Sequence, residues 1–236
     1  MLDEIRGAIA PSDAVLRAAR ERRDRVLSLA RGSPRTLRTY STGSIAHGTA
    51  NEDTDADCGV VLDRRVHPDL GPDGKGVGPR EVVEQVRSLL REKMGTDEGV
   101  GYRLTKRAIK VTFIDEVDGQ NPSVDLIVAL TRRDAPGLWI PNLKADAWDA
   151  SDPERHTELF TSGARELRRI RARATRLAKA WNKQWASPAF CSFQLEAFAW
   201  HAITESMNLG EALAALFSYG ASDLLRHDTP DPEEEA

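Results

Sequence analysis

Two aspartates separated by a single residue are the first feature of this sequence with a clear chemical meaning. Asp55 and Asp57 flank Ala56, which alternates in turn with Cys58. In an extended strand successive side chains point to opposite faces, so both carboxylates would share one face and the two small apolar residues the other. Carboxylates this close repel each other, and neither tolerates burial without a partner. Either water solvates both, or a cation lies between them.

A third carboxylate, Asp125, interrupts the otherwise apolar segment SVDLIVAL. An acidic residue inside an apolar strand needs a reason, and if the two segments are neighbouring strands, three carboxylates converge. Three oxygen donors suit Mg²⁺, which keeps waters and substrate phosphates as its remaining ligands. Two such ions, with Mn²⁺ as a substitute, would clamp an in-line phosphoryl displacement. We therefore expect Asp55, Asp57 and Asp125 to bind metal and to be catalytic.

A Gly-Ser pair precedes the first of these aspartates, with ten residues between Ser44 and that position. At a turn, Gly43 and Ser44 would let backbone amides and a hydroxyl approach phosphate oxygens. Each feature also has a structural interpretation. The aspartates could be solvated turn residues, Asp125 could pair with Arg103 or Arg107, and the Gly-Ser pair could be a plain turn. Their occurrence together, in this order, favours one shared site.

The periodicity of the chain predicts the elements that must position these residues. Residues 12–31 are expected to form an amphipathic helix capped by Ser12. Other expected elements are strands at TLRTYST and DADCGVVLD, a loop at 67–79, a helix at 81–94, strands at YRLTKRAIKVTFID and PSVDLIVAL, an irregular segment at 139–156, and helices at 157–185, about 192–208 and about 210–226.

Composition limits the classes of function. The 236 residues are 40% hydrophobic and 30% charged, with a net charge of −4 and a pI near 5.8. No global positive field draws the chain to nucleic acid or an anionic membrane, so a nucleotide site must be a local patch. Cys58 and Cys191 form neither a disulfide framework nor a zinc motif. With no signal-peptide pattern or membrane span in the sequence, we expect a cytoplasmic protein.

The segment GSIAHGTANEDTDADCGVVL resembles the signature of polymerase-β-like nucleotidyltransferases. More narrowly, it resembles the CD-NTases, relatives of cGAS and the oligoadenylate synthases, whose turn often continues as GSxxxGT before DxD. The likeness extends in the family's order over roughly residues 38–205, through RLTKRAIKVTF, VDLIVAL, AWDASDPERH, LRRIRARATRLAKAWNKQW and CSFQLEAFAW.

The resemblance implies an α+β fold in which a palm, a small twisted mixed sheet with flanking helices, is joined to a helical second lobe. It implies four regions: 1–34, an N-terminal helix packing on the helical lobe; 35–150, the catalytic palm; 151–226, the helical lobe with its spine helix; and 227–236, an acidic, disordered tail. It also implies site residues, namely the metal-binding Asp55, Asp57 and Asp125, and the phosphate-binding Gly43, Ser44, Lys179 and Ser192.

Helical periodicity offers an independent view of Lys179. An apolar stripe runs through Leu167, Ile170, Ala174, Leu177, Trp181 and Trp185, and Lys179 is predicted on the opposite side, within a basic face that could also be merely solvated. Ser192 could be only a helix N-cap. Trp148 is expected to pack rather than to stack on a base, and His47 and His156 to be surface or structural residues.

The expected activity is Mg²⁺-dependent transfer of a nucleotide, in which a ribose hydroxyl attacks the α-phosphate of a bound NTP, ATP or GTP, and pyrophosphate leaves. As the resemblance implies, the product would be a cyclic or linear oligonucleotide second messenger in bacterial antiphage signalling, under control of an activating ligand or protein. An RNA 3′ end, a protein or a small molecule could replace the nucleotide acceptor. A non-catalytic nucleotide sensor is the third interpretation.

Overall fold

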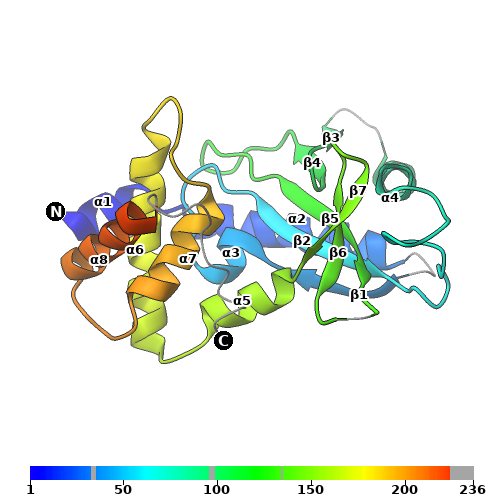
Figure 1. The fold of residues 1–236 in the computed structure, drawn as a ribbon. Coiled ribbons are helices and arrows are strands. Elements are labelled where there is room, and N and C mark those ends of the chain that lie inside the picture. Colours follow the sequence, from blue (N-terminus) through cyan, green and yellow to red (C-terminus); the bar gives the residue numbers. More distant parts are fainter. Residues whose placement is uncertain (33–35, 96–98, 134, 224–236) are drawn as a thin grey trace. The chain divides into compact units, whose positions relative to one another are not determined.

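The computed structural model describes residues 1–32, 36–95, 99–133 and 135–223. These residues form two compact units (Figure 1). The sheet unit contains residues 12–46 and 53–154. The helical unit contains residues 1–11, 47–52 and the described residues from 155 onward. The predicted α+β fold, a mixed sheet with flanking helices and a separate helical region, is confirmed.

The sheet unit is built on a mixed sheet of seven described strands. The strands are β1 (Thr36–Ser41), β2 (Ala56–Leu62), β3 (Val100–Leu104), β4 (Ile109–Phe113), β5 (Val124–Thr131), β6 (Leu138–Asn142) and β7 (Ala147–Ser151). Their order is β1-β2-β5-β4-β3, with β6 pairing with the end of β5 and with β7. Only β2 and β5 pair in parallel among these strands, and both are nearly continuous apolar runs, as strands covered on both faces are.

Two long helices flank the sheet: α2 (Asp13–Arg31) and α4 (Pro79–Met94). The Ser12 hydroxyl accepts a hydrogen bond from the amide of Val15 at 3.2 Å, so the predicted N-cap is confirmed. The described part of the predicted N-terminal region, residues 1–32, contains two helices, one in each unit. Helix α2 lies on β1, β2 and β5, and it is the shorter α1 (Leu2–Ala8) that packs on α6. Four residues of α2 are buried within the sheet unit: Val15, Ala19, Val26 and Ala30.

Two hairpins are found where the sequence predicted a single strand and an irregular segment. Residues 102–115 are not one strand, because β3 and β4 are joined by a turn in which Thr105 and Ala108 exchange hydrogen bonds. Residues 139–156 are not irregular, since β6 and β7 form an antiparallel pair there. Trp148 on β7 is buried, which confirms its packing role.

The helical unit consists of α1, α6 (Arg165–Lys183), α7 (Ser192–Ala202), α8 (Leu209–Asp223) and most of α5 (Pro153–Thr161). The single helix predicted over 157–185 is two helices, because Gly163 at φ +85° ends the first. The hydrophobic core of the helical unit joins α6, α7 and α8 through residues such as Ile170, Phe198 and Leu216. The acidic segment 227–236 and the end of the last predicted helix lie outside the described residues.

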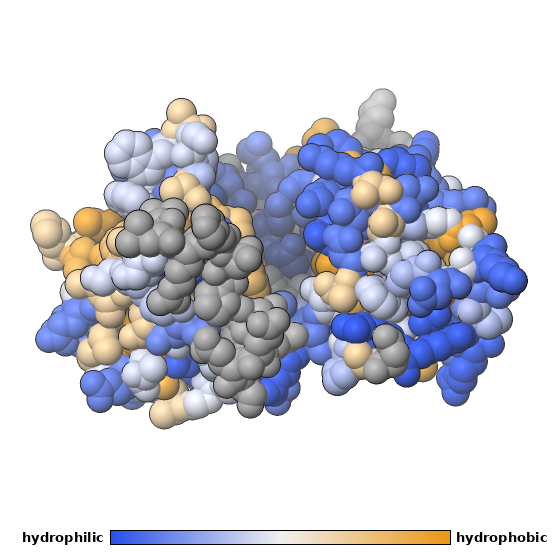
Figure 2. All heavy atoms as spheres, in the orientation of Figure 1, coloured by the Kyte–Doolittle hydropathy of each residue, from blue (hydrophilic) through white to orange (hydrophobic). Residues whose placement is uncertain are grey.

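The surface of the sheet unit is largely polar on the face that Figure 2 shows at the right, where hydrophilic side chains predominate. None of the helices in the described part of the chain combines the length and the apolar composition needed to cross a membrane.

The contact between Tyr40 and Gly59 on paired strands tests the packing of the sheet. A Cβ added at Gly59 would lie 2.1 Å from the Tyr40 ring, which is buried among Val61, Ala129 and Leu138. Gly59→Ala should therefore lower the free energy of unfolding by about 1–3 kcal/mol, because a buried ring has no room to move. Urea unfolding monitored by circular dichroism would measure the loss.

Gly7→Ala is the control for this prediction. Gly7 is helical and exposed, and an added Cβ there meets nothing within 4 Å, so alanine should be neutral or stabilising. Equal stability of Gly59→Ala and wild type would contradict the proposed packing.

Candidate functional site

The three predicted carboxylates come from the centre of the sheet. Strands β2 and β5 are neighbours, which is the condition that the convergence of the carboxylates required, and their parallel register places Asp57 directly opposite Asp125. Asp55 immediately precedes β2, two residues before Asp57 and therefore on the same face. The alternation is visible in burial: Ala56 and Cys58 are fully buried, whereas both aspartates are only partly covered. Asp53 is an exposed turn residue.

The Gly-Ser turn lies directly against Asp57. The amide of Thr42 donates to the backbone carbonyl of Asp57 at 3.1 Å. Gly43 has φ +74°, and a Cβ placed on it would lie 1.9 Å from Asp57 Oδ2. The position therefore requires glycine for two reasons, the left-handed backbone and the carboxylate that fills the side-chain space. Ser44 is the second residue of the short helix α3 (Gly43–His47), and its hydroxyl shares a 2.8 Å hydrogen bond with that of Thr54.

Asp55 is held by two side chains that the sequence analysis did not single out. The Ser123 hydroxyl donates to Oδ1, and the Lys110 ammonium donates to Oδ2. Lys110 is the register partner of Asp125 across the antiparallel β4–β5 pair. The signal that could have found Lys110 is the alternation of RAIKVTF, which places it on the polar face of a strand beside the acidic one.

Asp125 has one carboxylate oxygen that is not hydrogen-bonded within the described part of the chain. Its Oδ1 is buried without a hydrogen-bond partner among the described residues and lies 4.0 Å from Lys110 Nζ. Burial raises the pKa of Asp125, an effect that Lys110 and Arg103 oppose and Asp55 reinforces. The alternative pairing with Arg107 is wrong, because that guanidinium bonds to Asp149 at 2.9 Å.

The carboxylate set fits a hard divalent cation in its chemistry, although its present arrangement is not a metal centre. Among the described residues, no three His, Cys, Asp or Glu side chains are grouped as metal ligands. The donors are nevertheless all oxygens, one Asp125 oxygen lacks a hydrogen-bond donor among the described residues, and Gly43 places no side chain of its own against the Asp57 carboxylate. The cation that the structure places beside Asp55 is the ammonium group of Lys110.

Lys179 does not lie on an exposed basic face, so that prediction is wrong. It is buried, with Nζ 2.5 Å from Glu196 Oε1 and 3.0 Å from Thr49 Oγ1. The apolar stripe did not identify the buried side of the helix, because two of its residues, Trp181 and Trp185, are 40% and 57% exposed. A lysine can be buried where a fixed carboxylate neutralises it, and helical periodicity does not detect such a partner.

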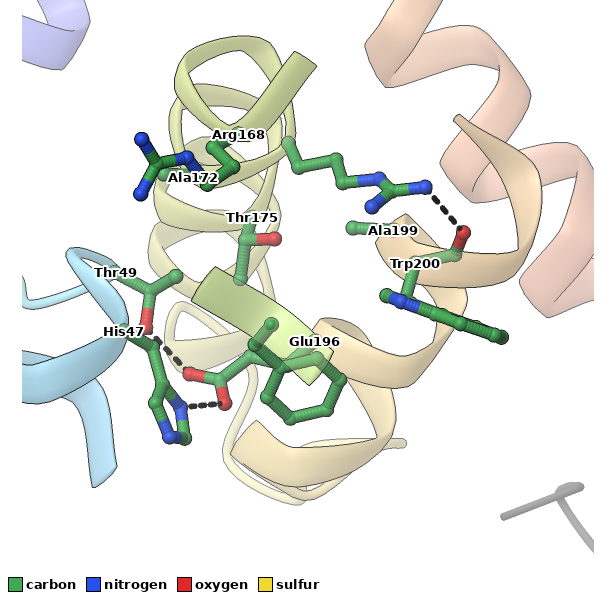
Figure 3. Close-up of a pocket in the computed structure, with 10 residues that line it drawn as sticks. His47, Thr49, Arg168, Ala172, Thr175, Glu196, Ala199 and Trp200 are labelled. Carbon is green, nitrogen blue, oxygen red and sulfur yellow. Dashed lines mark hydrogen bonds and ion pairs between the residues drawn. The ribbon is translucent and has the colours of Figure 1, made fainter. Parts of the chain in front are cut away.

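Glu196 on α7 is the centre of this buried network (Figure 3). Besides the Lys179 ammonium, the Thr49 hydroxyl donates a hydrogen bond to the Glu196 carboxylate. His47 Nδ1 lies 2.7 Å from Glu196 Oε2, and His47 Nε2 is hydrogen-bonded to the Thr157 hydroxyl. His47 is thus structural, as one of the two expectations had it. Burial alone would raise the pKa of Glu196, but the His47 hydrogen bond and the Lys179 charge together lower it to about 2. The adjoining cavity is about 20 Å³, room for a single water.

Ser192 is the first residue of α7 and is exposed. It is not the N-cap, because Cys191 occupies that position and its amide donates a hydrogen bond to Gln194 Oε1 at 2.9 Å. His156 packs its ring against Phe193 at 4.7 Å, as a structural residue does.

This geometry defines a class of fold. It brings together two aspartates at the start of β2, a third aspartate on the parallel neighbour β5 and a Gly-Ser turn beside Asp57. Neither a protein-family profile nor a curated protein matches the sequence. Solved structures do match, and those reported next are CD-NTases.

Three of these structures cover nearly the whole chain. CdnG of Bradyrhizobium diazoefficiens, in complex with GTP, has a TM-score of 0.74 at 17% identity over 98% of this chain and 80% of its own. CdnC of E. coli MS115-1, in a complex with HORMA-deltaN, has a TM-score of 0.68 at 21% identity, and the match covers 95% of this chain and 70% of CdnC. The cyclic AMP-GMP synthase DncV of Vibrio cholerae, a prokaryotic cGAS homolog, has a TM-score of 0.67 at 16% identity, and the match covers 98% of this chain and 79% of DncV. The chain has the CD-NTase fold.

Two glycines of the same segment provide a matched test of the turn. Gly43 and Gly48 both have positive φ, at +74° and +76°, but only Gly43 would place a Cβ in the Asp57 carboxylate. Gly48→Ala should lower the free energy of unfolding by about 1–2 kcal/mol from backbone strain alone. Gly43→Ala should cost about 1–3 kcal/mol more, because the carboxylate must be displaced. Equal losses in chemical denaturation would refute the contact.

Neutralising Glu196 tests the buried network. Glu196→Gln leaves the Lys179 ammonium buried without a counter-charge, so the free energy of unfolding at pH 7 should fall by about 3–5 kcal/mol. Glu205→Gln, on an exposed position, should have no effect.

The pH dependence of this difference has a definite sign. The folded pKa of Glu196 is lowered, so its contribution is complete above the unfolded value of roughly 4.3 and is lost as the pH falls toward about 2. Denaturation curves of wild type and Glu196→Gln should converge in that acidic range and stay apart above it. A constant difference down to the acid limit would show that Glu196 is not the ionised partner.

Proposed function

We propose that this protein is a metal-dependent nucleotidyltransferase that joins NTPs into a cyclic or linear oligonucleotide with release of pyrophosphate. The observation that carries the proposal is the position of Asp57, which lies against the Gly43 turn and opposite Asp125. The turn that we propose to bind phosphate is thereby adjacent to a carboxylate pair, as transfer of a nucleotide from a triphosphate requires.

The comparisons support the choice of substrate and product. CdnG is described in complex with GTP, and DncV is described as a cyclic AMP-GMP synthase. CdnE of Elizabethkingia meningoseptica is a cyclic dinucleotide synthase solved with GTP and a nucleotide analogue. These are properties of the similar proteins. For this chain we propose ATP, GTP or both as substrates on the strength of the shared fold.

Each residue of the carboxylate set receives a role in the proposal. Asp55, Asp57 and Asp125 would hold Mg²⁺ or Mn²⁺, which when bound supplies charge neutralisation at the reacting and leaving phosphates. Gly43 and the Ser44 hydroxyl would orient the triphosphate through the turn.

The transfer itself balances without any further reactant. The acceptor hydroxyl oxygen forms a bond to the α-phosphorus, and the bond from that phosphorus to the bridging oxygen breaks. Pyrophosphate leaves with the electron pair of the broken bond. Asp125 is the residue we propose to take the hydroxyl proton, because its buried Oδ1 has no other donor among the described residues.

The two proposed phosphate ligands of the helical unit differ in availability. Ser192 is exposed at the first turn of α7 and can accept or donate a hydrogen bond there. Lys179 is buried and bound to Glu196 and Thr49, so two of its three N–H donors are already in use. A role in antiphage signalling and an activating ligand or protein complete the proposal and rest on the family resemblance alone.

A product assay tests the proposed activity. The full chain would be incubated with Mg²⁺ or Mn²⁺ and all four α-labelled NTPs, with Asp55→Asn/Asp57→Asn as the control. We expect a small labelled product, resistant to phosphatase if cyclic, that the control lacks by a factor of 10² or more, roughly the effect of losing charge stabilisation. Chromatography before and after phosphatase would identify its bases.

Two other outcomes would favour the alternatives. If label moves into macromolecules when total RNA or cell lysate is added, the acceptor is an RNA end or a protein. If no label moves under any of these conditions and the double variant binds NTP as wild type does, the carboxylates are not catalytic and the protein is a sensor.

A further inference from the structure

Lys110 places its ammonium group among the carboxylates of the candidate metal site. Its side chain rises from β4 opposite Asp125, donates to Asp55 Oδ2, and lies 4.0 Å from Asp125 Oδ1. The three side chains are only 22–35% exposed. A bridge of this kind is better shielded from water than an ordinary surface ion pair.

Both oxygens of Asp55 are engaged in the structure. Oδ1 accepts from Ser123, and Oδ2 accepts from Lys110. An ion that is to be coordinated by Asp55 needs one of these oxygens, and an ammonium in hydrogen-bonding contact with a carboxylate repels a divalent cation at the same place. The Lys110 ammonium and a divalent cation therefore compete for Oδ2, because the two positive charges repel each other there.

The charges around the bridge nevertheless call for more positive charge than Lys110 brings. Lys110 bonds to Asp55 and lies near Asp125, and Arg103 is a further positive charge that acts on Asp125. Asp57 lies opposite Asp125 on the paired strand, and two carboxylates this close repel each other. A lysine is a compact charge on a flexible four-carbon stem, so it can withdraw from Asp55 without any movement of the strands.

We infer that Lys110 is an internal counter-cation, a positioning residue that binds Asp55 when no metal is present and must be displaced for metal to enter. It organises the carboxylates in the metal-free protein, and it raises the concentration of divalent cation that the site requires. The inference rests on the proposed function, because it takes the three carboxylates as metal ligands.

Two other roles for Lys110 give different results. A purely structural lysine would support the carboxylates, so its loss would weaken metal binding or leave it unchanged. A lysine that binds substrate phosphate would leave metal binding unchanged in the absence of nucleotide. Only a competing cation makes metal binding tighter when it is removed.

Calorimetric titration of the full chain with Mn²⁺, in the absence of nucleotide, separates these roles. Lys110→Met should lower the apparent dissociation constant on the order of tenfold, the scale of changes next to metal ligands. Its metal-free melting temperature should fall, and saturating Mn²⁺ should raise it by more than in wild type. Lys106→Met removes the same charge from an exposed position and should match wild type. An unchanged or larger dissociation constant for Lys110→Met overturns the inference.

Lys110→Arg keeps the test decisive if the methionine variant does not fold. Arginine retains the charge and can bind a carboxylate bidentately, so Mn²⁺ should bind as weakly as to wild type or more weakly. Tighter binding to this variant would overturn the inference.

Failure of the proposed function gives a separate result. If wild type and Asp57→Asn bind Mn²⁺ equally, or if no variant binds it, the carboxylates are not metal ligands and both proposals fall. If wild type binds Mn²⁺ through Asp57 while Lys110→Met shows no gain, only the role of Lys110 is wrong.

Discussion

The pairing of β2 with β5 is the constraint on which the candidate site depends. Parallel register puts Asp57 opposite Asp125, and the antiparallel register of the next pair puts Lys110 opposite Asp125. A row of acid, acid and base thus crosses three strands on one face of the sheet. Such a row is tolerable only because a cation accompanies it, since two adjacent carboxylates cannot both be ionised and desolvated without compensation. The glycine at position 43 follows from the same geometry, because the Asp57 carboxylate occupies the space of its side chain.

Asp125 and Glu196, one in each unit, show how the number of donors decides the role of a buried acid. The Glu196 carboxylate is hydrogen-bonded to three side chains, those of His47, Thr49 and Lys179, and its pKa is lowered despite burial. Asp125 has an oxygen without a donor among the described residues, and burial raises its pKa. A fully satisfied carboxylate is a structural element. An incompletely satisfied one is where a ligand or proton can still bind.

Local periodicity predicted the elements best where one chemical pattern dominates. The apolar runs of β2 and β5 and the capped helix α2 were found because burial on a sheet requires those patterns. The β3–β4 hairpin was missed because its turn at 105–108 contains neither glycine nor proline. The β6–β7 hairpin was missed because Pro141 indicates loop. Proline is tolerated there since β5 pairs with β6 only through Trp139 and Leu138.

By itself the sequence determined which residue types were available for chemistry: the spaced aspartates, the acid in an apolar strand and the Gly-Ser turn, because strand alternation and turn chemistry are local properties. The tertiary structure decided which of them meet. It placed Asp57 on Gly43 and Lys110 on Asp55, and it paired Lys179 with Glu196 rather than exposing it. Those contacts join residues distant in the chain, and register and burial, which no local pattern records, select them.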